Sequence, residues 1–269
     1  MERAEFGGVT IIGGRDGAAR FGFTERAGGV SAAPYASLNL GSHVGDDPAA
    51  VEENRRRALA ALRGGACSGL PGVDALMGSL LVPNQVHGDR VAVVGSSHPD
   101  ELDRVRALIA EGADAIVCTA PSVPVLLCFA DCVPVILTAP RGFAVVHSGW
   151  KGTYARIAAK AARVLMDRTG CAPSEITAHV GPHILGDEYE VSPELIEKFD
   201  LAFGWGLRDR TRLLDLSRAI AQALCEEGVP PCNIDDPSLS TVRGNDRFFS
   251  YRAEGGKTGR HAAIALMEP

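Results

Sequence analysis

The chain has 269 residues, of which 46% are hydrophobic and 22% charged, and its formal net charge is −6. It is long enough to bury a sizeable core, as one large domain or as two tightly packed lobes. A binding surface for nucleic acid or for an anionic membrane needs concentrated Lys and Arg, which this acidic composition argues against. Small molecules are therefore the expected partners.

The cysteine content and the apolar segments indicate where the protein resides. Seven Cys residues in a chain of this length are typical of reduced thiols, and we expect a cytoplasmic protein without a signal peptide. Residues 115–140 carry only Asp131 as a charge over about the length of a membrane span. Four prolines and short Val/Ile-rich runs within this segment predict buried strands instead.

The first third of the chain alternates short strands with one clear helix. Strands are predicted at residues 9–12, ending at Gly13-Gly14, and at residues 20–24. A helix is predicted to begin at Asp47-Pro48, with a capping carboxylate and a proline in its first turn, and to run to about Arg63. Residues 66–78 are Gly-rich and indicate a loop.

The remaining elements form no regular repeat. We predict strands at 80–88, 90–94, 175–180, 248–252 and 261–267, successive strands within 115–146, and helices at 100–110, 192–203 and 215–227. A further helix is predicted after Gly152, capped by Thr153 and ended by Gly170. Helices and strands without a βαβ period predict an α+β fold with layered, mixed sheets and outer helices.

Residues 130–152 hold the most informative stretch of the sequence. Cys132 begins one apolar run and His147 ends the next, and a Pro-Arg-Gly turn at 140–142 separates the two runs. In an antiparallel hairpin, both side chains would lie at the same end of the sheet. A thiol beside an imidazole suits either a metal site or a Cys/His nucleophile pair.

A metal site here would have to be non-local. The chain contains no CxxC pair, and Cys128 and Cys132 would lie about 13 Å apart in one extended strand, too far to share one ion. His87, beside Gly88 at the end of a short apolar run, is the most attractive third ligand. Three protein ligands with an open fourth position are typical of catalytic zinc, although buried Cys and His residues also serve as plain packing. For the histidines at 43, 98, 179 and 183, we expect structural or solvent-facing roles.

Several short motifs occur in one order along nearly the whole chain. They are Asn39-Leu-Gly with Val44-Gly-Asp-Asp and Glu53-Asn-Arg, Gln85-Val-His-Gly, Ala113-Asp-Ala, Ala130-Asp-Cys-Val-Pro, His147-Ser-Gly-Trp-Lys-Gly, Val180-Gly-Pro with Tyr189-Glu-Val, and Phe249-Ser-Tyr-Arg with Gly259-Arg. Together these motifs resemble the laccase-domain family, also described as polyphenol oxidase or peptidoglycan-editing-factor proteins and as purine nucleoside phosphorylases.

This resemblance implies a fold, a metal and an activity. It implies one α/β/β/α layered domain over residues 1–269 and one zinc ion held by His87, Cys132 and His147. It also implies phosphate-dependent cleavage of adenosine, inosine, guanosine and methylthioadenosine, with deamination of adenosine to inosine as a second reaction. The implied partners are purine nucleosides and inorganic phosphate, and we expect a monomer or weak homodimer.

Other residues that match the motifs are candidates for binding the substrates. For phosphate we expect Arg55 and Lys151, the latter just before a helix N-terminus, although Lys151 could equally face solvent. Asn39, Gln85 and Arg252 are weaker candidates for contacts to the nucleoside. Asp131 would point away from Cys132 in a regular strand, so we expect a supporting or structural role for it.

The sequence departs from the family pattern at several positions and leaves alternatives open. Ser148 and Lys151 replace a frequent Ala and Arg, and a Lys lacks the bidentate fork of Arg. Further departures are Glu188, Ser240 and Ala253. Seven scattered His and no His-x-His pair make multicopper oxidation improbable, although copper at the His/Cys site could give weak oxidase activity in vitro. The alternatives are a metal-free hydrolase with Cys132 as nucleophile and His147 as base, and a non-enzymatic protein that binds a nucleoside or a cell-wall precursor.

Overall fold

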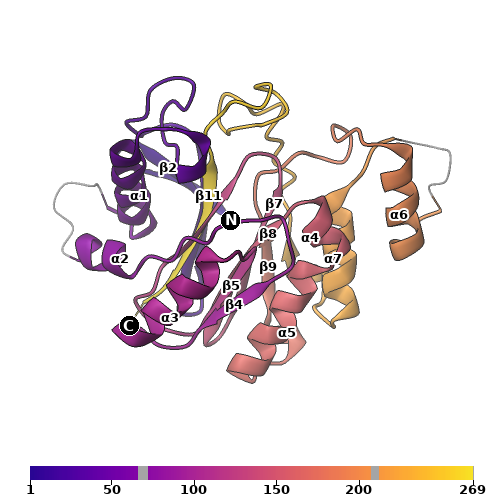
Figure 1. Ribbon diagram of the computed structural model, residues 1–269. Coiled ribbons are helices and arrows are strands. Elements are labelled where there is room, and N and C mark those ends of the chain that lie inside the picture. Colours follow the sequence, from indigo (N-terminus) through magenta and orange to yellow (C-terminus); the bar gives the residue numbers. More distant parts are fainter. Residues whose placement is uncertain (66–71, 207–211, 269) are drawn as a thin grey trace.

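Two β-sheets lie face to face, and helices cover their outer faces (Figure 1). The computed structural model describes residues 1–65, 72–206 and 212–268. The five-stranded sheet has the order β1 (Glu2–Phe6), β2 (Val9–Asp16), β3 (Ala19–Thr24), β11 (His261–Met267) and β6 (Val125–Phe129). The six-stranded sheet has the order β10 (Ile234–Asp235), β9 (Thr177–Val180), β7 (Val133–Ala139), β8 (Gly142–Ser148), β5 (Ala115–Cys118) and β4 (Val91–Val94).

Both sheets combine parallel and antiparallel pairings. In the six-stranded sheet, β10–β9 and β4–β5 are parallel while the central pairs are antiparallel. In the five-stranded sheet the named strands pair antiparallel, and a parallel bridge joins Leu81 to Val125. The prediction of mixed sheets is confirmed.

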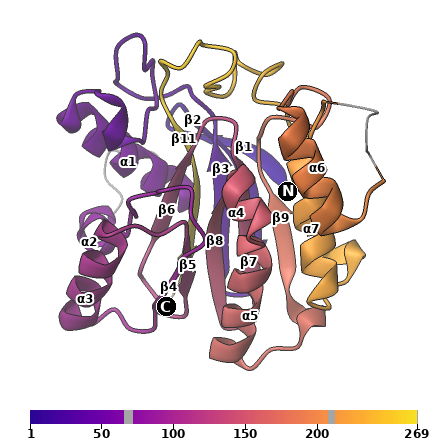
Figure 2. The same ribbon diagram turned by 45° about the vertical axis from the view of Figure 1, so that its right-hand side comes forward.

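Three buried clusters define the layers. One lies between the sheets, where Phe21, Phe129 and Phe143 meet, and it extends to helix α3 (Pro99–Ala110). A second joins the five-stranded sheet to α1 (Pro48–Leu62) and α2 (Val73–Ser79). The third joins the six-stranded sheet to α5 (Ile157–Thr169), α6 (Pro193–Phe203) and α7 (Leu216–Glu226), which Figure 2 shows together over one face. The molecule is a single α+β domain with the predicted α/β/β/α layers.

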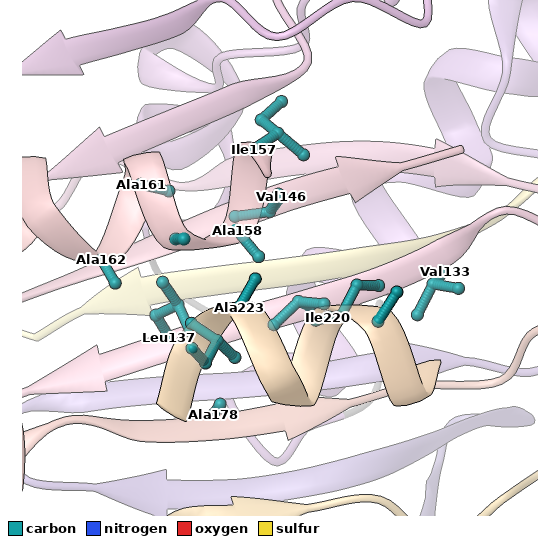
Figure 3. Close-up of a cluster of buried hydrophobic side chains, with 14 of the residues drawn as sticks. Val133, Leu137, Val146, Ile157, Ala158, Ala161, Ala162, Ala178, Ile220 and Ala223 are labelled. Atoms are coloured by element: carbon teal, nitrogen blue, oxygen red, sulfur yellow. The ribbon is translucent and has the colours of Figure 1, made fainter. Parts of the chain in front are cut away.

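Small side chains let the helices approach the six-stranded sheet closely. Ala158, Ala161 and Ala162 of α5 and Ala223 of α7 point toward the strands in Figure 3. They meet larger strand residues such as Leu137, which is fully buried. Each alanine removes apolar surface from water without filling the space that the strand side chains occupy.

The predicted helix after Gly152 is in fact two helices. Helix α4 spans Trp150–Tyr154, and α5 follows after Arg156, whose φ of +60° places it in the left-handed region. That conformation interrupts the helical hydrogen bonds. Lys151 therefore lies inside α4 and not just before a helix, so that part of the prediction was wrong. Gly170 ends α5 in the left-handed conformation, as predicted.

Several other boundaries differ from the prediction. Strand β2 continues through Gly13, where a Cβ would lie 2.1 Å from the Phe21 carbonyl oxygen, so glycine permits the close pairing. Residues 73–79 form α2 and not a loop, whereas residues 66–71 lie outside the described chain. Residues 248–252 form no strand, and residues 251 and 252 lie in a turn. In the 80–88 segment only Leu81 pairs with a strand. Strand β1 was not predicted.

None of the helices within the described ranges is both long enough and apolar enough to cross a membrane.

Candidate metal centre and its cavity

The β7–β8 hairpin brings Cys132 and His147 to one end of the six-stranded sheet. Cys132 directly precedes β7, and in the antiparallel register Val133 pairs with Ser148 and Pro134 with His147. The predicted hairpin is confirmed. His87 joins them from the segment between α2 and β4, with a left-handed φ of +57° that turns the chain beside the hairpin.

The three side chains converge closely enough to hold a metal ion. Their ligand atoms all lie within 4.8 Å of one another. The two imidazole rings meet edge to face, with centroids 4.8 Å apart at an interplanar angle of 80°. His147 is buried, Cys132 is partly exposed and His87 is exposed, so the group is open on one side. Two imidazoles and one thiolate form a donor set that zinc accepts.

Asp114 positions two of the three potential ligands, His147 and His87, through hydrogen bonds. Its buried carboxylate accepts a hydrogen bond from His147 Nδ1 at 2.8 Å, which leaves Nε2 of His147 for a metal. The same carboxylate accepts the backbone N–H groups of His87 at 3.0 Å and Gly88 at 2.7 Å. One side chain therefore fixes both the ring of His147 and the chain at His87.

Burial and neighbouring charges set the protonation of the centre. Burial alone would raise the pKa of the Cys132 thiol, but the charges and hydrogen bonds of His147 and His87 outweigh it and lower that pKa to about 6. Burial would lower the pKa of His147, but Cys132 and Asp114 raise it to about 9. The pKa of Asp114 is lowered, because its hydrogen bonds and the His147 charge overcome the effect of burial. A thiolate at neutral pH is the form of Cys that binds metals.

The centre opens into a cavity of about 570 Å³. This volume falls within the range of small-molecule sites. Its lining combines the three potential ligands with aromatic, apolar and cationic side chains: His43, Gln85, His87, Cys128, Phe129, Ala130, Asp131, Cys132, His147, Ile184, Tyr189, Tyr251, Arg252 and Arg260.

Gln85 and Arg252 line this cavity, whereas Asn39 does not. The Gln85 amide is bonded to the backbone of Cys128 in both directions, donating at 2.9 Å and accepting at 2.8 Å. Asn39 is fully buried, donates to Asp46 at 2.8 Å and accepts the backbone N–H of Arg260 at 2.8 Å. Asn39 thus organises the chain beside the cavity.

Arg55 and Lys151 also lie outside the cavity lining. The Arg55 guanidinium donates two hydrogen bonds to the Leu40 carbonyl, at 3.0 and 2.9 Å, and borders a neighbouring cavity of about 500 Å³. Lys151 is exposed, with Nζ 5.6 Å from the centre of the Trp150 ring. Phosphate binding by these two residues stays a prediction.

Asp131 lies in a turn and not in a regular strand. Its φ of +92° brings it to the cavity, so the expectation that it faces away from the site was wrong. The carboxylate accepts Thr241 Oγ1 at 2.6 Å and the backbone N–H of Arg252 at 2.7 Å. It therefore holds the Arg252 segment against the cavity, in a supporting role.

Sequence reasoning did not assign several residues of the site. Asp114, Tyr189, Tyr251 and Arg260 all stand in motifs that carried the resemblance, and that was the available signal. His43 was expected to have a structural or solvent-facing role, yet it lines the cavity. His179 and His183 are buried outside the cavity lining, and His98 lies on the surface near Asp100.

Gly149 makes the approach of the ligands possible and offers a test of the site. A Cβ at this position would lie 3.1 Å from both Cys132 Sγ and His87 Cδ2. The backbone of Gly149 is extended, which Ala also adopts. Gly149→Ala should therefore weaken metal binding by roughly 10–100-fold, because neighbours displaced by an extra methyl cost about 1–3 kcal/mol.

A chelator competition on the purified variant measures this effect. Gly78→Ala in α2 is the matched control, since its Cβ would meet nothing within 4 Å. Equal metal affinity in the Gly149→Ala variant and the wild type would contradict the geometry.

The chain is similar to known proteins over nearly its full length. A family model described as multi-copper polyphenol oxidoreductase laccase matches residues 20–268. A purine nucleoside phosphorylase of Streptomyces coelicolor is 37% identical over 272 residues, covering 96% of this chain and 100% of that protein. Another, of Mycobacterium tuberculosis, is 36% identical over 259 residues, covering 91% and 90%.

Solved structures share the same arrangement. The hypothetical protein YfiH of Bacillus licheniformis superposes with a TM-score of 0.80 at 29% identity and covers 98% of each chain. YlmD of Geobacillus stearothermophilus gives a TM-score of 0.79 at 30% identity, covering 94% of this chain and 93% of that one. With the family match over residues 20–268, this chain belongs to the laccase-domain family.

Proposed function

We propose that this protein is a purine nucleoside phosphorylase that uses one zinc ion held by His87, Cys132 and His147. The observation that carries the proposal is the convergence of these ligand atoms within 4.8 Å beside a cavity of nucleoside size. Relatives about 36% identical over most of the chain are named purine nucleoside phosphorylases, which supports the same reaction here.

The proposed reaction is phosphate-dependent cleavage of adenosine, inosine, guanosine and methylthioadenosine, with deamination of adenosine as a second activity. Zinc at these ligands would supply Lewis-acid polarisation of an oxygen bound beside it. The exposed Tyr251 and the partly buried Tyr189 offer ring faces for a purine, and Gln85 and Arg252 offer polar contacts. Arg55 and Lys151 stay the predicted contacts to phosphate from the family motifs.

Two expectations lie outside these observations. The cytoplasmic location and the monomer or weak homodimer stay predictions.

Two other mechanisms fit the centre less well. One observation favours a metal-free hydrolase. The pKa of the Cys132 thiol is about 6 and that of the His147 imidazole about 9, so a thiolate would pair with a protonated imidazole at neutral pH. Multicopper oxidation requires several ligand sets, and across the described ranges the His87, Cys132 and His147 group is the one cluster of three such side chains.

Chromatography of adenosine incubated with the purified protein tests the proposal. We expect phosphate-dependent release of adenine together with a phosphorylated ribose, and inosine formed without phosphate would report deamination. A protein confirmed to hold zinc that forms neither product would overturn the purine assignment and favour the hydrolase or the binding protein.

A further inference from the structure

Two arginine side chains and one histidine gather around the short segment 40–43 at the edge of the catalytic cavity. Arg55 donates both of its hydrogen bonds to the Leu40 carbonyl, and the Leu40 N–H donates to the Arg260 carbonyl at 3.0 Å. A Cβ on Gly41 would lie 2.8 Å from Arg260 Cγ and 3.3 Å from His43 Cε1. The Arg260 side chain and the His43 ring therefore flank Gly41.

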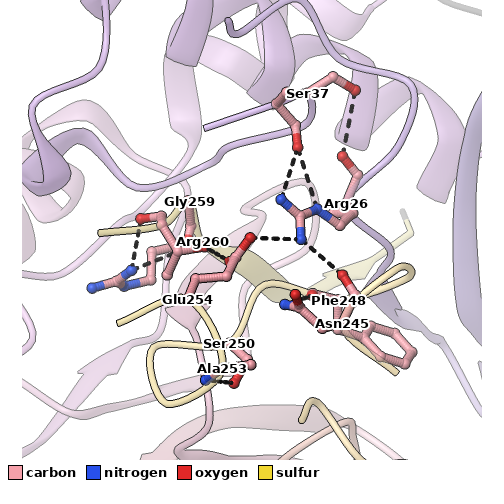
Figure 4. A network of polar contacts seen from close by, with 11 residues as sticks. Arg26, Ser37, Asn245, Phe248, Ser250, Ala253, Glu254, Gly259 and Arg260 are labelled. Atoms are coloured by element: carbon pink, nitrogen blue, oxygen red, sulfur yellow. Dashed lines mark hydrogen bonds and ion pairs between the residues drawn. The ribbon is translucent and has the colours of Figure 1, made fainter. Parts of the chain in front are cut away.

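The Arg55 and Arg260 guanidinium groups have no acidic partner within the described part of the chain. Nη1 of Arg260 donates to the carbonyls of Thr258 at 3.0 Å and Gly259 at 2.9 Å. Arg26 provides the contrast in Figure 4: it is also partly buried, but it pairs with Glu254 at 2.9 Å.

Partial burial of charges without a counter-ion is unfavourable, and such charges in a cavity are suited to an anionic ligand. Both Arg55 and Arg260 are partly buried, whereas Arg252, which also lines the cavity, is exposed.

Burial and the two arginine charges shift the pKa values of Arg260 and His43, which line the cavity. Burial lowers the pKa of Arg260 from its usual value. The pKa of His43 is also lowered, first by desolvation, although the residue as a whole is exposed, and then by the charges of Arg260 and Arg55. A neutral His43 imidazole retains one N–H that can donate to an oxyanion. This corner of the cavity thus combines fixed positive charge with hydrogen-bond donors.

We propose that Arg260 and His43, which line this cavity, form the subsite that binds inorganic phosphate, and that Arg55, outside the lining, supports it through the Leu40 carbonyl. This inference rests on the proposed phosphorylase function, and it assigns the phosphate to the segment 40–43 instead of to α4 and Lys151. Arg260 lines the same cavity as the three potential metal ligands, so a phosphate beside it would share the enclosed space with the nucleoside. Asn39 supports the subsite, because its side-chain oxygen accepts the N–H groups of both Gly41 and Arg260.

Calorimetric titration of the zinc-loaded protein with inorganic phosphate, in the absence of nucleoside, tests the subsite. Arg260→Gln should weaken phosphate binding by roughly 10–100-fold, the usual effect of losing charge-assisted hydrogen bonds. Arg260→Lys keeps the positive charge but not the two-pronged guanidinium group, so it should lose less phosphate affinity than Arg260→Gln. Arg57→Gln is the matched control: Arg57 lies in the same helix as Arg55, pairs with Glu53 at 2.8 Å and does not line the cavity, so this variant should keep phosphate binding within about twofold of the wild type.

Steady-state kinetics then separate this subsite from the overall reaction. In Arg260→Gln the KM for phosphate should rise by the same factor as the dissociation constant, while the KM for the nucleoside changes little. Phosphate binding of wild-type strength in Arg260→Gln, or no phosphate binding by the wild type, would overturn the subsite.

Turnover of nucleosides by the wild type is judged on its own, so the phosphorylase proposal can stand or fall separately. If Arg260→Gln loses its thermal unfolding transition, the Arg260→Lys and His43→Gln variants decide instead, and wild-type affinity in both would count against the subsite.

Discussion

Replacing Cys132 with Ala is expected to abolish both stoichiometric zinc binding and phosphorolysis. The thiolate is one of three potential ligands whose donor atoms lie within 4.8 Å, and two imidazoles alone would leave the ion incompletely held. The loss of metal affinity should exceed the approximately 10–100-fold loss that is typical when a residue that only hydrogen-bonds to a metal ligand is replaced. Metal content of the purified variant and adenine release from adenosine measure the two effects together.

Cys118→Ala is the matched control for this change. Cys118 is fully buried, and burial raises its pKa to about 12, so it stays a neutral thiol. It pairs with Phe143 near the opposite end of β5 and β8, away from His147. We expect this variant to lose some stability and to keep its metal and activity. Full activity of Cys132→Ala with zinc still bound would show that the ligand set is wrong.

Asp114→Asn should lower zinc affinity by about 10–100-fold while the chain remains folded. The carboxylate accepts from His147 and from the backbone N–H groups of His87 and Gly88, whereas an Asn amide has one oxygen and must turn its NH₂ toward N–H donors. Groups left unpaired cost about 1–3 kcal/mol of stability. Chelator competition and thermal unfolding measure the two consequences.

Asp131→Asn separates support of the metal from support of the cavity. Asp131 holds Thr241 and the Arg252 backbone and makes none of the contacts that Asp114 makes. Its variant should therefore keep zinc affinity near the wild-type value and raise the KM for the nucleoside. Equal loss of zinc in both variants would count against the special role of Asp114.

Local signals in the sequence predicted the helix starts and the central hairpin. Asp47, Ser192 and Asp215 each accept a backbone N–H in the first turn of α1, α6 and α7, and all three stand where these helices were predicted to begin. Short-range hydrogen bonds of this kind depend on neighbouring residues alone. The pairing of β11 with both β3 and β6 joins distant segments, and no local pattern encodes it.

In the candidate site, too, local signals predicted some residues, while the roles of others depend on long-range contacts. Cys132 and His147 were placed together by one hairpin, and His87 was added by its position beside Gly88 and by the family motifs. The roles of Asp114 and Arg260 depend on contacts across 33 and 221 residues of sequence, with His147 and Asn39 respectively. Lys151 was misplaced relative to its helix because α4 begins at Trp150, ahead of Gly152. The left-handed Arg156 then divides the predicted helix in two, and helical periodicity does not reveal such a break.

Zinc titration of the metal-stripped protein tests the central claim most directly. The protein is freed of metal by a chelator, zinc is added back in steps, and phosphate-dependent adenine release is measured at each step. We predict negligible activity without metal, and a linear recovery that ends at one zinc per chain. Full activity in the stripped protein would contradict the metal centre and favour Cys132 and His147 as a nucleophile and base.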